Sequence, residues 1–329
     1  MTRQRLLCCC SSQTHNTKKV SCGGLIQRGD ERGPGTNLTL MSYNILTEKF
    51  CNSVTFPEIE PVFLSQESRF HALQKEIQGF ACDIVCFQES KMVAWEVLKD
   101  FMKKQGYDGI QQQRETQIPL AIFYKIESVQ LSWHEERSRA LLCEFRNMKE
   151  DLDKVIYVIN VHLEGAPGRE ASKKRVSQLH HALHRLQHRL EVSGVEHTSL
   201  ARVIIMGDFN SNIDDPPCQF LEQGSLEASQ EATKHIHRDS DGHETNQIGH
   251  PFSLQEAYVA CNIHPEFTHI RNKMGSRVDF AWVTPDTVTV RNVLNPLPQR
   301  FTWHSLRDTG SPNDLLCSDH LPIGVHVSY

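Results

Sequence analysis

A stretch near the middle of the chain joins the pattern of a buried strand to side chains that can do chemistry. Four apolar residues, Val203–Met206, run without a break into Gly207, Asp208 and, two positions later, Asn210. An unbroken apolar run favours a strand covered on both faces, and residues two apart in an extended segment point the same way. A carboxylate that only accepts hydrogen bonds would then share a cleft with an amide that donates and accepts. The alternative for these residues alone is an Asx turn that closes the strand.

Similar polar residues lie at the ends or edges of other predicted strands. Together they are Asn44, Glu89, His162, Asp208, Asn210, Asp279, Asp319 and His320. Four carboxylates in one cleft would repel one another, since like charges ~4 Å apart cost several kcal/mol at a protein-like dielectric. A hard divalent cation removes that cost, and oxygen ligands without cysteine favour Mg²⁺ or Mn²⁺. Because Mg²⁺ commonly binds through one or two carboxylates plus substrate phosphate, the predicted substrate is a phosphate ester.

Alternating strand and helix patterns connect these residues. Strands are predicted at 37–46, 83–89, 120–124, 140–145, 154–162, 203–206, 277–283, 287–294 and 324–329, and helices at 65–80, 91–105, 169–192, 216–221 and 253–260. The polar segment 223–250 is predicted to be a long mobile loop, and 299–313 a polar insertion.

Composition is typical of a globular protein. The chain has 329 residues, 39% of them hydrophobic, and no run approaches the 18 apolar residues of a membrane span. Residues 1–36 carry six Lys/Arg and two Asp/Glu, which leaves a net charge of −9 on the remainder. An acidic body argues against general electrostatic adhesion to nucleic acid, so a nucleic-acid substrate would need local basic groups and bound cations.

The cysteines and the N-terminal segment suggest a compartment. Eleven cysteines are scattered without zinc-ribbon spacing, which predicts a reducing, cytoplasmic or nuclear setting. Residues 1–36 are predicted to be a disordered basic tail. Alternatives for this tail are an organellar, mitochondrial-type targeting peptide and palmitoylation of Cys8–Cys10.

Two other motifs have some features of metal sites. His180, His184 and His188 recur every four residues, a spacing that could hold zinc, but neighbouring basic residues favour a solvated basic surface. Asp239–Gly242 has the beginning of a calcium loop but lacks glycine at its sixth position and glutamate at its twelfth.

Six motifs in order resemble the endonuclease/exonuclease/phosphatase superfamily over about Leu38 to Tyr329. They are Ser42–Leu46, Phe87–Glu89, Asn160–Leu163, Gly207–Ser211, Val278–Phe280 and Ser318–Ile323. Within the superfamily the chain is most similar to carbon-catabolite-repressor-type deadenylases, nocturnin and angel. The resemblance implies one catalytic domain over residues 37–329, an α/β fold of the DNase I type. Two mainly antiparallel sheets would pack face to face between helices, in four α/β/β/α layers.

The resemblance also implies roles for the site residues. Glu89, helped by Asn44 and supported by Asp319, would bind Mg²⁺. Asp208 would deprotonate the attacking water, and Asn210 would hold that water and the phosphate. His320, oriented by Asp279, would donate a hydrogen bond to a non-bridging phosphate oxygen as negative charge builds in the transition state, and His162 would make a second phosphate contact.

Two positions bear on the substrate. Pro167 matches a residue that flanks adenine in deadenylases, whereas Met274 stands where those enzymes stack an aromatic ring on the base. The predicted activity is a 3′-to-5′ exoribonuclease on RNA ends such as poly(A), without a membrane span. One alternative is a phosphatase acting on a small phosphorylated nucleotide or inositol phosphate, and another is a non-catalytic RNA-binding protein on this fold.

Overall fold

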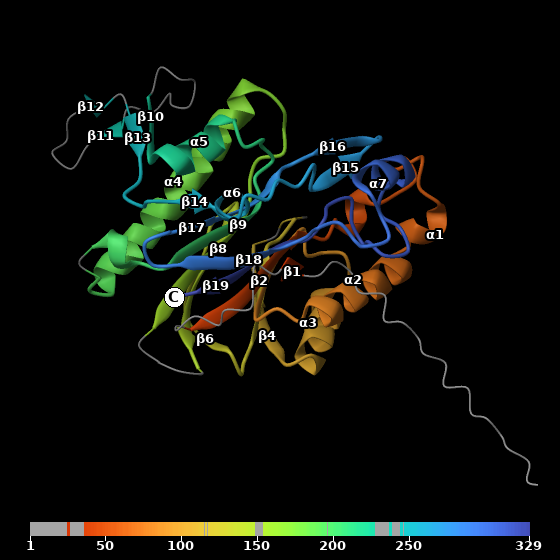
Figure 1. Cartoon of the computed structure of the whole chain (residues 1–329), viewed down its shortest axis with the longest axis horizontal. Helices are drawn as coiled ribbons and strands as arrows, with labels where there is room; N and C mark the ends of the chain where they lie inside the picture. The colour runs from red at the N-terminus through yellow and green to blue at the C-terminus, as the bar shows by residue number, and fades with distance from the viewer. Residues whose placement is uncertain are drawn as a thin grey trace, which may run out of the picture.

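Two β-sheets packed face to face form the centre of the computed structural model, and helices cover both outer faces (Figure 1). The structure describes residues 25–26, 36–114, 116, 118–148, 154–195, 197–227, 237–238, 244–245 and 247–329. No helix in the described part of the chain is long and apolar enough to cross a membrane.

The sheets contain seven and six strands. The first has the order β1 (Leu25–Ile26), β18 (Thr289–Leu294), β19 (Ile323–Ser328), β2 (Asn37–Asn44), β3 (Ile84–Gln88), β5 (Ala121–Lys125) and β4 (Tyr107–Gln111). The second has the order β14 (Gln255–Glu256), β17 (Asp279–Val283), β9 (Val203–Asp208), β8 (Val155–His162), β7 (Ala140–Asn147) and β6 (Val129–Glu136). Only the β2–β3 and β8–β9 pairs of these two sheets are parallel, which confirms the predicted mainly antiparallel arrangement.

Short hairpins and helices complete the fold. The hairpins pair β10 (Ser225–Glu227) with β13 (Gln247–Gly249), β11 (His237–Arg238) with β12 (Glu244–Thr245), and β15 (His269–Arg271) with β16 (Met274–Ser276). The helices are η1 (Glu48–Phe50), α1 (Pro61–Leu64), α2 (Gln66–Phe80), α3 (Trp95–Lys104), α4 (Arg169–Val192), η2 (Thr198–Leu200), α5 (Pro216–Gln223), α6 (Ala257–Ala260) and α7 (Trp303–Thr309).

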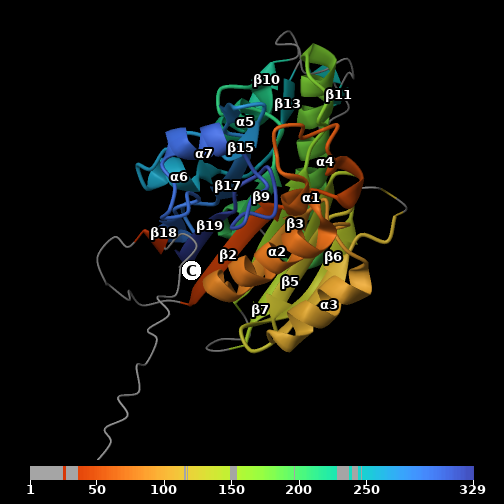
Figure 2. The ribbon, with the colours of Figure 1, turned by 90° about the vertical axis from the view of Figure 1, so that its right-hand side faces the viewer.

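Three apolar layers hold the sheets and helices together. Residues such as Leu40, Phe145 and Met206 fill the space between the two sheets. The outer face of the seven-stranded sheet packs on α2 and α3, which stand in front of β3 and β5 in Figure 2. The outer face of the six-stranded sheet packs on α4 and α5. These layers confirm the four-layer α/β/β/α prediction.

Sequence patterns explain the main helices. Ser65 caps α2, since its side chain accepts a hydrogen bond from the Ser68 backbone N–H. The helix ends at Ala81, which adopts a left-handed conformation with φ of 49°. α4 buries an apolar stripe that includes Val176, Leu179 and Leu183, and the helix has the predicted bounds.

Some local predictions were wrong. Residues 253–260 do not form one helix, because Gln255 and Glu256 pair with β17 and the Glu256 side chain then caps α6. The insertion at 299–313 contains α7, which a Thr302–Ser305 capping box begins. The segment 223–250 is not a continuous loop, because the β10–β13 hairpin closes it.

Two further predictions concern segments that are largely undescribed. The Asp239–Gly242 motif lies outside the described residues. So does almost all of the predicted tail, in which Leu25 and Ile26 pair with β18.

A buried carboxyl under the seven-stranded sheet makes stability depend on pH. Glu76 of α2 accepts hydrogen bonds from the Tyr43 hydroxyl at 3.2 and 3.3 Å. Burial raises the pKa of Glu76 from 4.5 to about 8. The folded state therefore holds this proton more tightly than the unfolded state. The resulting stabilisation is complete below pH 4.5 and is lost as the pH rises through about 8.

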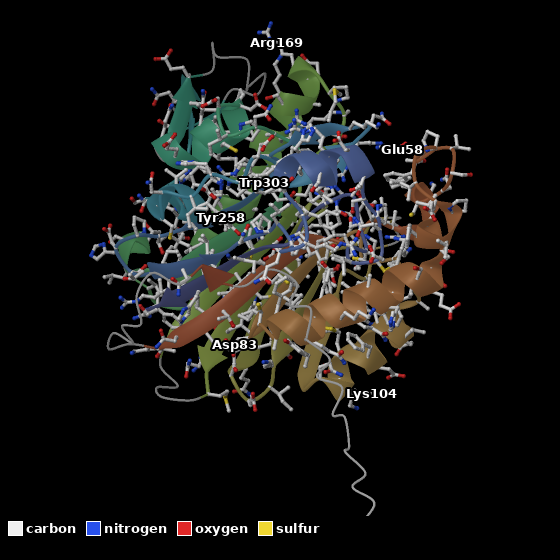
Figure 3. All side chains as sticks on the ribbon, turned by 45° about the vertical axis from the view of Figure 1, so that its right-hand side comes forward. Glu58, Asp83, Lys104, Arg169, Tyr258 and Trp303 are labelled. Carbon is white, nitrogen blue, oxygen red and sulfur yellow. The ribbon has the colours of Figure 1, made fainter. Side chains whose placement is uncertain are left out.

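Glu76→Gln is expected to flatten this pH dependence. Between pH 5 and 8 the free energy of unfolding of the wild type should fall, relative to the variant, by at most about 1.4 kcal/mol per pH unit. Urea unfolding of both proteins across this range measures the difference. Glu58→Gln, at an exposed residue labelled in Figure 3, is the control and should keep the wild-type slope. Equal slopes for wild type and Glu76→Gln would contradict the prediction.

Candidate active site

Strands from both sheets deliver polar side chains to one end of the molecule. The carboxyl ends of β2, β3, β8 and β9 carry Asn44, Glu89, His162 and Asp208, while β17 begins there with Asp279. Figure 3 labels Asp83, just before β3, and Lys104 toward the lower end of the molecule. Arg169, the first residue of α4, comes a short segment after the end of β8 and is labelled at the upper end. The carboxyl ends of these strands therefore point toward the upper end in this view.

Asp208 combines both functions that its sequence context suggests. Its Oδ1 accepts the Asn210 backbone N–H at 2.9 Å, which is an Asx turn. Its Oδ2 accepts from Asn44 Nδ2 at 3.0 Å and lies 3.5 Å from His162 Nε2 and 3.7 Å from His320 Nε2. One oxygen therefore fixes the turn, and the other faces the cluster of imidazoles and amide.

Gly207 serves a different purpose from the one its position suggests. It does not turn the chain but stays within β9, paired with Val161 and Phe280. A Cβ at this position would lie 2.0 Å from the Val161 carbonyl oxygen. Glycine is thus required for close approach of β8 and β9, and the chain turns at Asn210, where φ is 48°.

Glu89 is held by donors that leave one of its oxygens open. Oε2 accepts the Thr47 backbone N–H at 2.9 Å. Oε1 lies 3.4 Å from Asn44 Nδ2 and 3.9 Å from His162 Nε2, longer than an ordinary hydrogen bond of about 2.9 Å. Asn44 presents its amide nitrogen to both carboxylates, because its oxygen accepts the Leu46 N–H at 3.0 Å. Asn44 therefore orients Glu89 in this arrangement.

His320 and Asp279 form a close pair. His320 Nδ1 lies 2.9 Å from Asp279 Oδ2, and this contact turns Nε2 toward Asp208. Although burial opposes protonation, the carboxylates of Asp279 and Asp208 raise the pKa of His320 to about 10. Conversely, His320 and His162 hold the pKa of buried Asp208 below its ordinary value, against the effect of burial. Protonated His320 is therefore a proton donor beside the carboxylate of Asp208, which can act as a base.

Asp319 contacts a histidine that sequence reasoning missed. His269 Nε2 lies 3.3 Å from Asp319 Oδ2, and the His269 ring lies 4.6 Å from that of His320. Burial opposes ionisation of Asp319, but His269 lowers its pKa to about 2. His269 lies in β15, between the Gly207–Ser211 and Val278–Phe280 motifs, where no strand was predicted. Thr268 accepts the Asp279 N–H at 3.0 Å through its hydroxyl.

The two predicted base-binding residues lie on segments that border this cluster. Pro167 is exposed between β8 and α4, where a Cβ at neighbouring Gly165 would lie 3.7 Å from Asn210 Nδ2. Met274 is 71% exposed on β16, and His269 lies on the opposite strand of the same hairpin. In Figure 1 this hairpin lies beside α7.

The donor set fits a divalent cation. Among the described residues, His269, Asp319 and His320 offer ligand atoms within 4.8 Å of one another, as do Asp208, Asp279 and His320. Glu89 Oε1 makes only long contacts and adds an open carboxylate oxygen. It lies next to these groups, because His162 Nε2 is close to both Glu89 Oε1 and Asp208 Oδ2. Because a protonated His320 cannot bind a metal, the ligands for a hard cation here are the buried carboxylate oxygens.

Comparison with known proteins identifies the family of the chain. The sequence matches the Endonuclease/Exonuclease/phosphatase family over residues 41–320. The Ccr4 3′-5′-exoribonuclease subunit of the CCR4-Not complex from Candida albicans is 24% identical over 329 residues, covering 87% of this chain and 40% of that protein. Mouse 2′,5′-phosphodiesterase 12 is 26% identical over 318 residues, covering 83% and 50%. The chain thus spans half the length of these relatives or less.

Solved structures share the fold. ANGEL2, described as a 2′,3′-cyclic phosphatase, superimposes with a TM-score of 0.70 at 21% identity, covering 92% of this chain and 99% of that chain. The catalytic domain of human Nocturnin superimposes with a TM-score of 0.61 at 15% identity, covering 93% and 97%. With a family match over most of its length and this fold, the chain belongs to the endonuclease/exonuclease/phosphatase family of hydrolytic enzymes.

Proposed function

We propose that the protein is a Mg²⁺-dependent phosphodiesterase that acts on RNA as a 3′-to-5′ exoribonuclease of the deadenylase type. The observation that carries the proposal is the environment of Asp208 Oδ2, which faces one amide and two imidazoles at 3.0 to 3.7 Å. A carboxylate base beside a protonated histidine suits attack of water on a phosphate ester. The similarity to Ccr4 subunits supports RNA as the substrate.

Each side chain has a distinct task in this reaction. Asp208 Oδ2 accepts the proton of the attacking water, and its pKa below the ordinary value keeps it ionised. Asn210, whose Nδ2 donates to the Leu163 carbonyl at 3.1 Å, is held where its amide can contact the phosphate. His320 Nε2 donates to a non-bridging phosphate oxygen as negative charge develops.

Glu89 would hold the cation, oriented by Thr47 and Asn44, and Asp319 would support it from the His269 side. When bound, the cation would neutralise charge on the phosphate and on the departing oxygen. His162 stands between Glu89 and Asp208, with its Nε2 3.9 Å from Glu89 Oε1 and 3.5 Å from Asp208 Oδ2. This nitrogen of the imidazole would make the second phosphate contact.

A second candidate is a phosphatase or cyclic phosphatase acting on a small nucleotide or an RNA end. The exposed thioether of Met274 favours it, because stacking of a base on an aromatic ring contributes ~1–3 kcal/mol per base and this position lacks the ring. ANGEL2 is described as a 2′,3′-cyclic phosphatase and shares the fold. The same catalytic centre can serve either reaction, since fold alone does not determine the leaving group.

A substrate panel is expected to separate these candidates. We expect cleavage of 3′-5′-linked oligo(A) and oligo(U) in the presence of Mg²⁺, with shortening from the 3′ end and no cleavage after chelation with EDTA. The panel also contains 2′-5′-linked oligo(A), RNA ending in a 2′,3′-cyclic phosphate, NADPH and inositol phosphates. Products resolved by gel and mass spectrometry identify the bond broken. If only the small phosphates or the cyclic ends react, the exoribonuclease proposal is wrong.

Glu89→Ala serves as the control for the metal assignment. It removes the proposed ligand and should abolish most Mg²⁺-dependent turnover. Turnover equal to wild type would reject Glu89 as the ligand, and EDTA-resistant cleavage would reject the metal dependence.

A further inference from the structure

A buried arginine outside the catalytic cluster links two of the segments that form it. Arg69 lies in the first turn of α2 and is 2% exposed. Its Nε donates to the Cys317 carbonyl at 2.7 Å, and its Nη2 donates to the carbonyls of Ile45, at 2.6 Å, and Leu46. Among the described residues, its hydrogen-bond acceptors are these three backbone carbonyls and no carboxylate. One guanidinium thus joins segments that are far apart in the sequence.

The first segment continues from Asn44 and orients Glu89. The Leu46 N–H donates to Asn44 Oδ1 at 3.0 Å, and the next N–H, that of Thr47, donates to Glu89 Oε2 at 2.9 Å. Leu46 has a φ of 52°, in the left-handed region that a leucine rarely adopts. Arg69 donates to the carbonyl of Ile45, just before Leu46, and to the carbonyl of Leu46 itself. These two bonds stabilise the turn that directs the Thr47 N–H toward Glu89.

The second segment leads into the other half of the site. Cys317 is followed by Ser318, whose hydroxyl accepts the His320 N–H at 3.2 Å and lies 3.3 Å from Asp319 Oδ1. The Cys317 carbonyl, to which Arg69 donates, therefore belongs to a residue three positions before His320 in the sequence. The fork of donors on a guanidinium spans both segments from separate nitrogens, whereas the three donors of an ammonium sit on one nitrogen.

We propose that Arg69 is a positioning residue that fixes the Glu89 side of the site relative to the Asp319–His320 side. The charge-assisted bonds to three carbonyls offset part of the cost of burying the guanidinium. Partners that orient a metal ligand typically contribute 10- to 100-fold in metal affinity or activity. Measurements of kcat and of metal binding test this role only if the proposed function holds, whereas backbone hydrogen exchange tests it independently.

The test compares Arg69→Lys and Arg69→Met with wild type in the full-length chain. Hydrogen exchange followed by mass spectrometry should show faster exchange in both segments, 44–47 and 317–320, in each folded variant. Mn²⁺ titration followed by electron paramagnetic resonance should give about 10- to 100-fold weaker binding. With a phosphate ester that wild type cleaves, kcat should fall by a similar factor while KM changes little. Lysine should recover part of the loss, because it keeps one charged donor.

Tyr258→Phe is the matched control, because it also removes buried bonds. In the wild type the Tyr258 hydroxyl donates to the Leu294 carbonyl at 2.8 Å and accepts the Gly324 N–H at 3.0 Å. Tyr258 is labelled in Figure 3. This variant should lose stability without faster exchange at 44–47 and 317–320. Wild-type exchange in both segments of folded Arg69→Lys would overturn the proposal, as would equal loss of protection in Tyr258→Phe. A wild type that binds no Mn²⁺ and cleaves no phosphate ester would refute the proposed function, while hydrogen exchange would still decide the role of Arg69.

Discussion

Asp208→Asn is expected to lower kcat by on the order of 10³-fold, the range of a general base held in hydrogen-bond reach of its proton. The amide has nearly the same shape but cannot take a proton from water. In addition, an amide nitrogen placed at the Oδ2 position would face Asn44 Nδ2, so that two donors would meet where a donor and an acceptor now lie 3.0 Å apart. The loss should therefore combine the missing base with disorder in the residues around it.

Initial rates at saturating substrate measure this loss, and a thermal melt confirms that the variant is folded. Asp286→Asn, at an exposed aspartate after β17, is the control and should retain wild-type kcat. A folded Asp208→Asn enzyme that keeps more than about one tenth of wild-type kcat would show that another group is the base.

The position of the site follows from sequence because strand ends are local features. Apolar runs such as Val203–Met206 reveal a buried strand, and the polar residue that ends each run marks its carboxyl end. The parallel pairs β2–β3 and β8–β9 bring four such ends together. The antiparallel strand β17 begins at the same edge, so Asp279 pairs directly with Asp208.

Contacts made through the tertiary structure could not be read in the same way. Arg69 follows three polar residues, Gln66–Ser68, at the start of a helix, where sequence suggests a solvated side chain, and its carbonyl partners come from distant segments. His269 belongs to a three-residue strand without periodicity. Local sequence also could not separate an Asx turn from a carboxylate that faces a cleft at Asp208, because Oδ1 accepts the Asn210 N–H of the turn while Oδ2 accepts from distant Asn44.

Other properties stay predictions. The roles carried over from the family to Pro167 and Met274 depend on a bound base, and the reducing compartment depends on cysteine usage. The seven described cysteines are all buried, as expected of cysteines that serve as small apolar residues.

His320→Gln is expected to have the second-largest effect, a loss of kcat on the order of 10²-fold or more, because a charged donor to the phosphate disappears. Asp279→Asn should cost less, since Asp279 acts by orienting His320 through the 2.9 Å contact at Nδ1. The double variant should then be no slower than His320→Gln alone, as residues that act as a unit are not additive. His326→Gln, within β19, is the control and should keep wild-type kcat.

The pH profile of Asp279→Asn distinguishes this coupling from a purely structural role for Asp279. In the wild type, His320 stays protonated until its pKa of about 10, so activity that requires its proton falls only above that pH. Removing the Asp279 carboxylate lowers the pKa of His320, and the basic limb of log kcat against pH should move to lower pH by about one unit or more. A lower kcat with the basic limb unmoved would show that Asp279 supports the fold of β17 and has no part in holding the proton on His320.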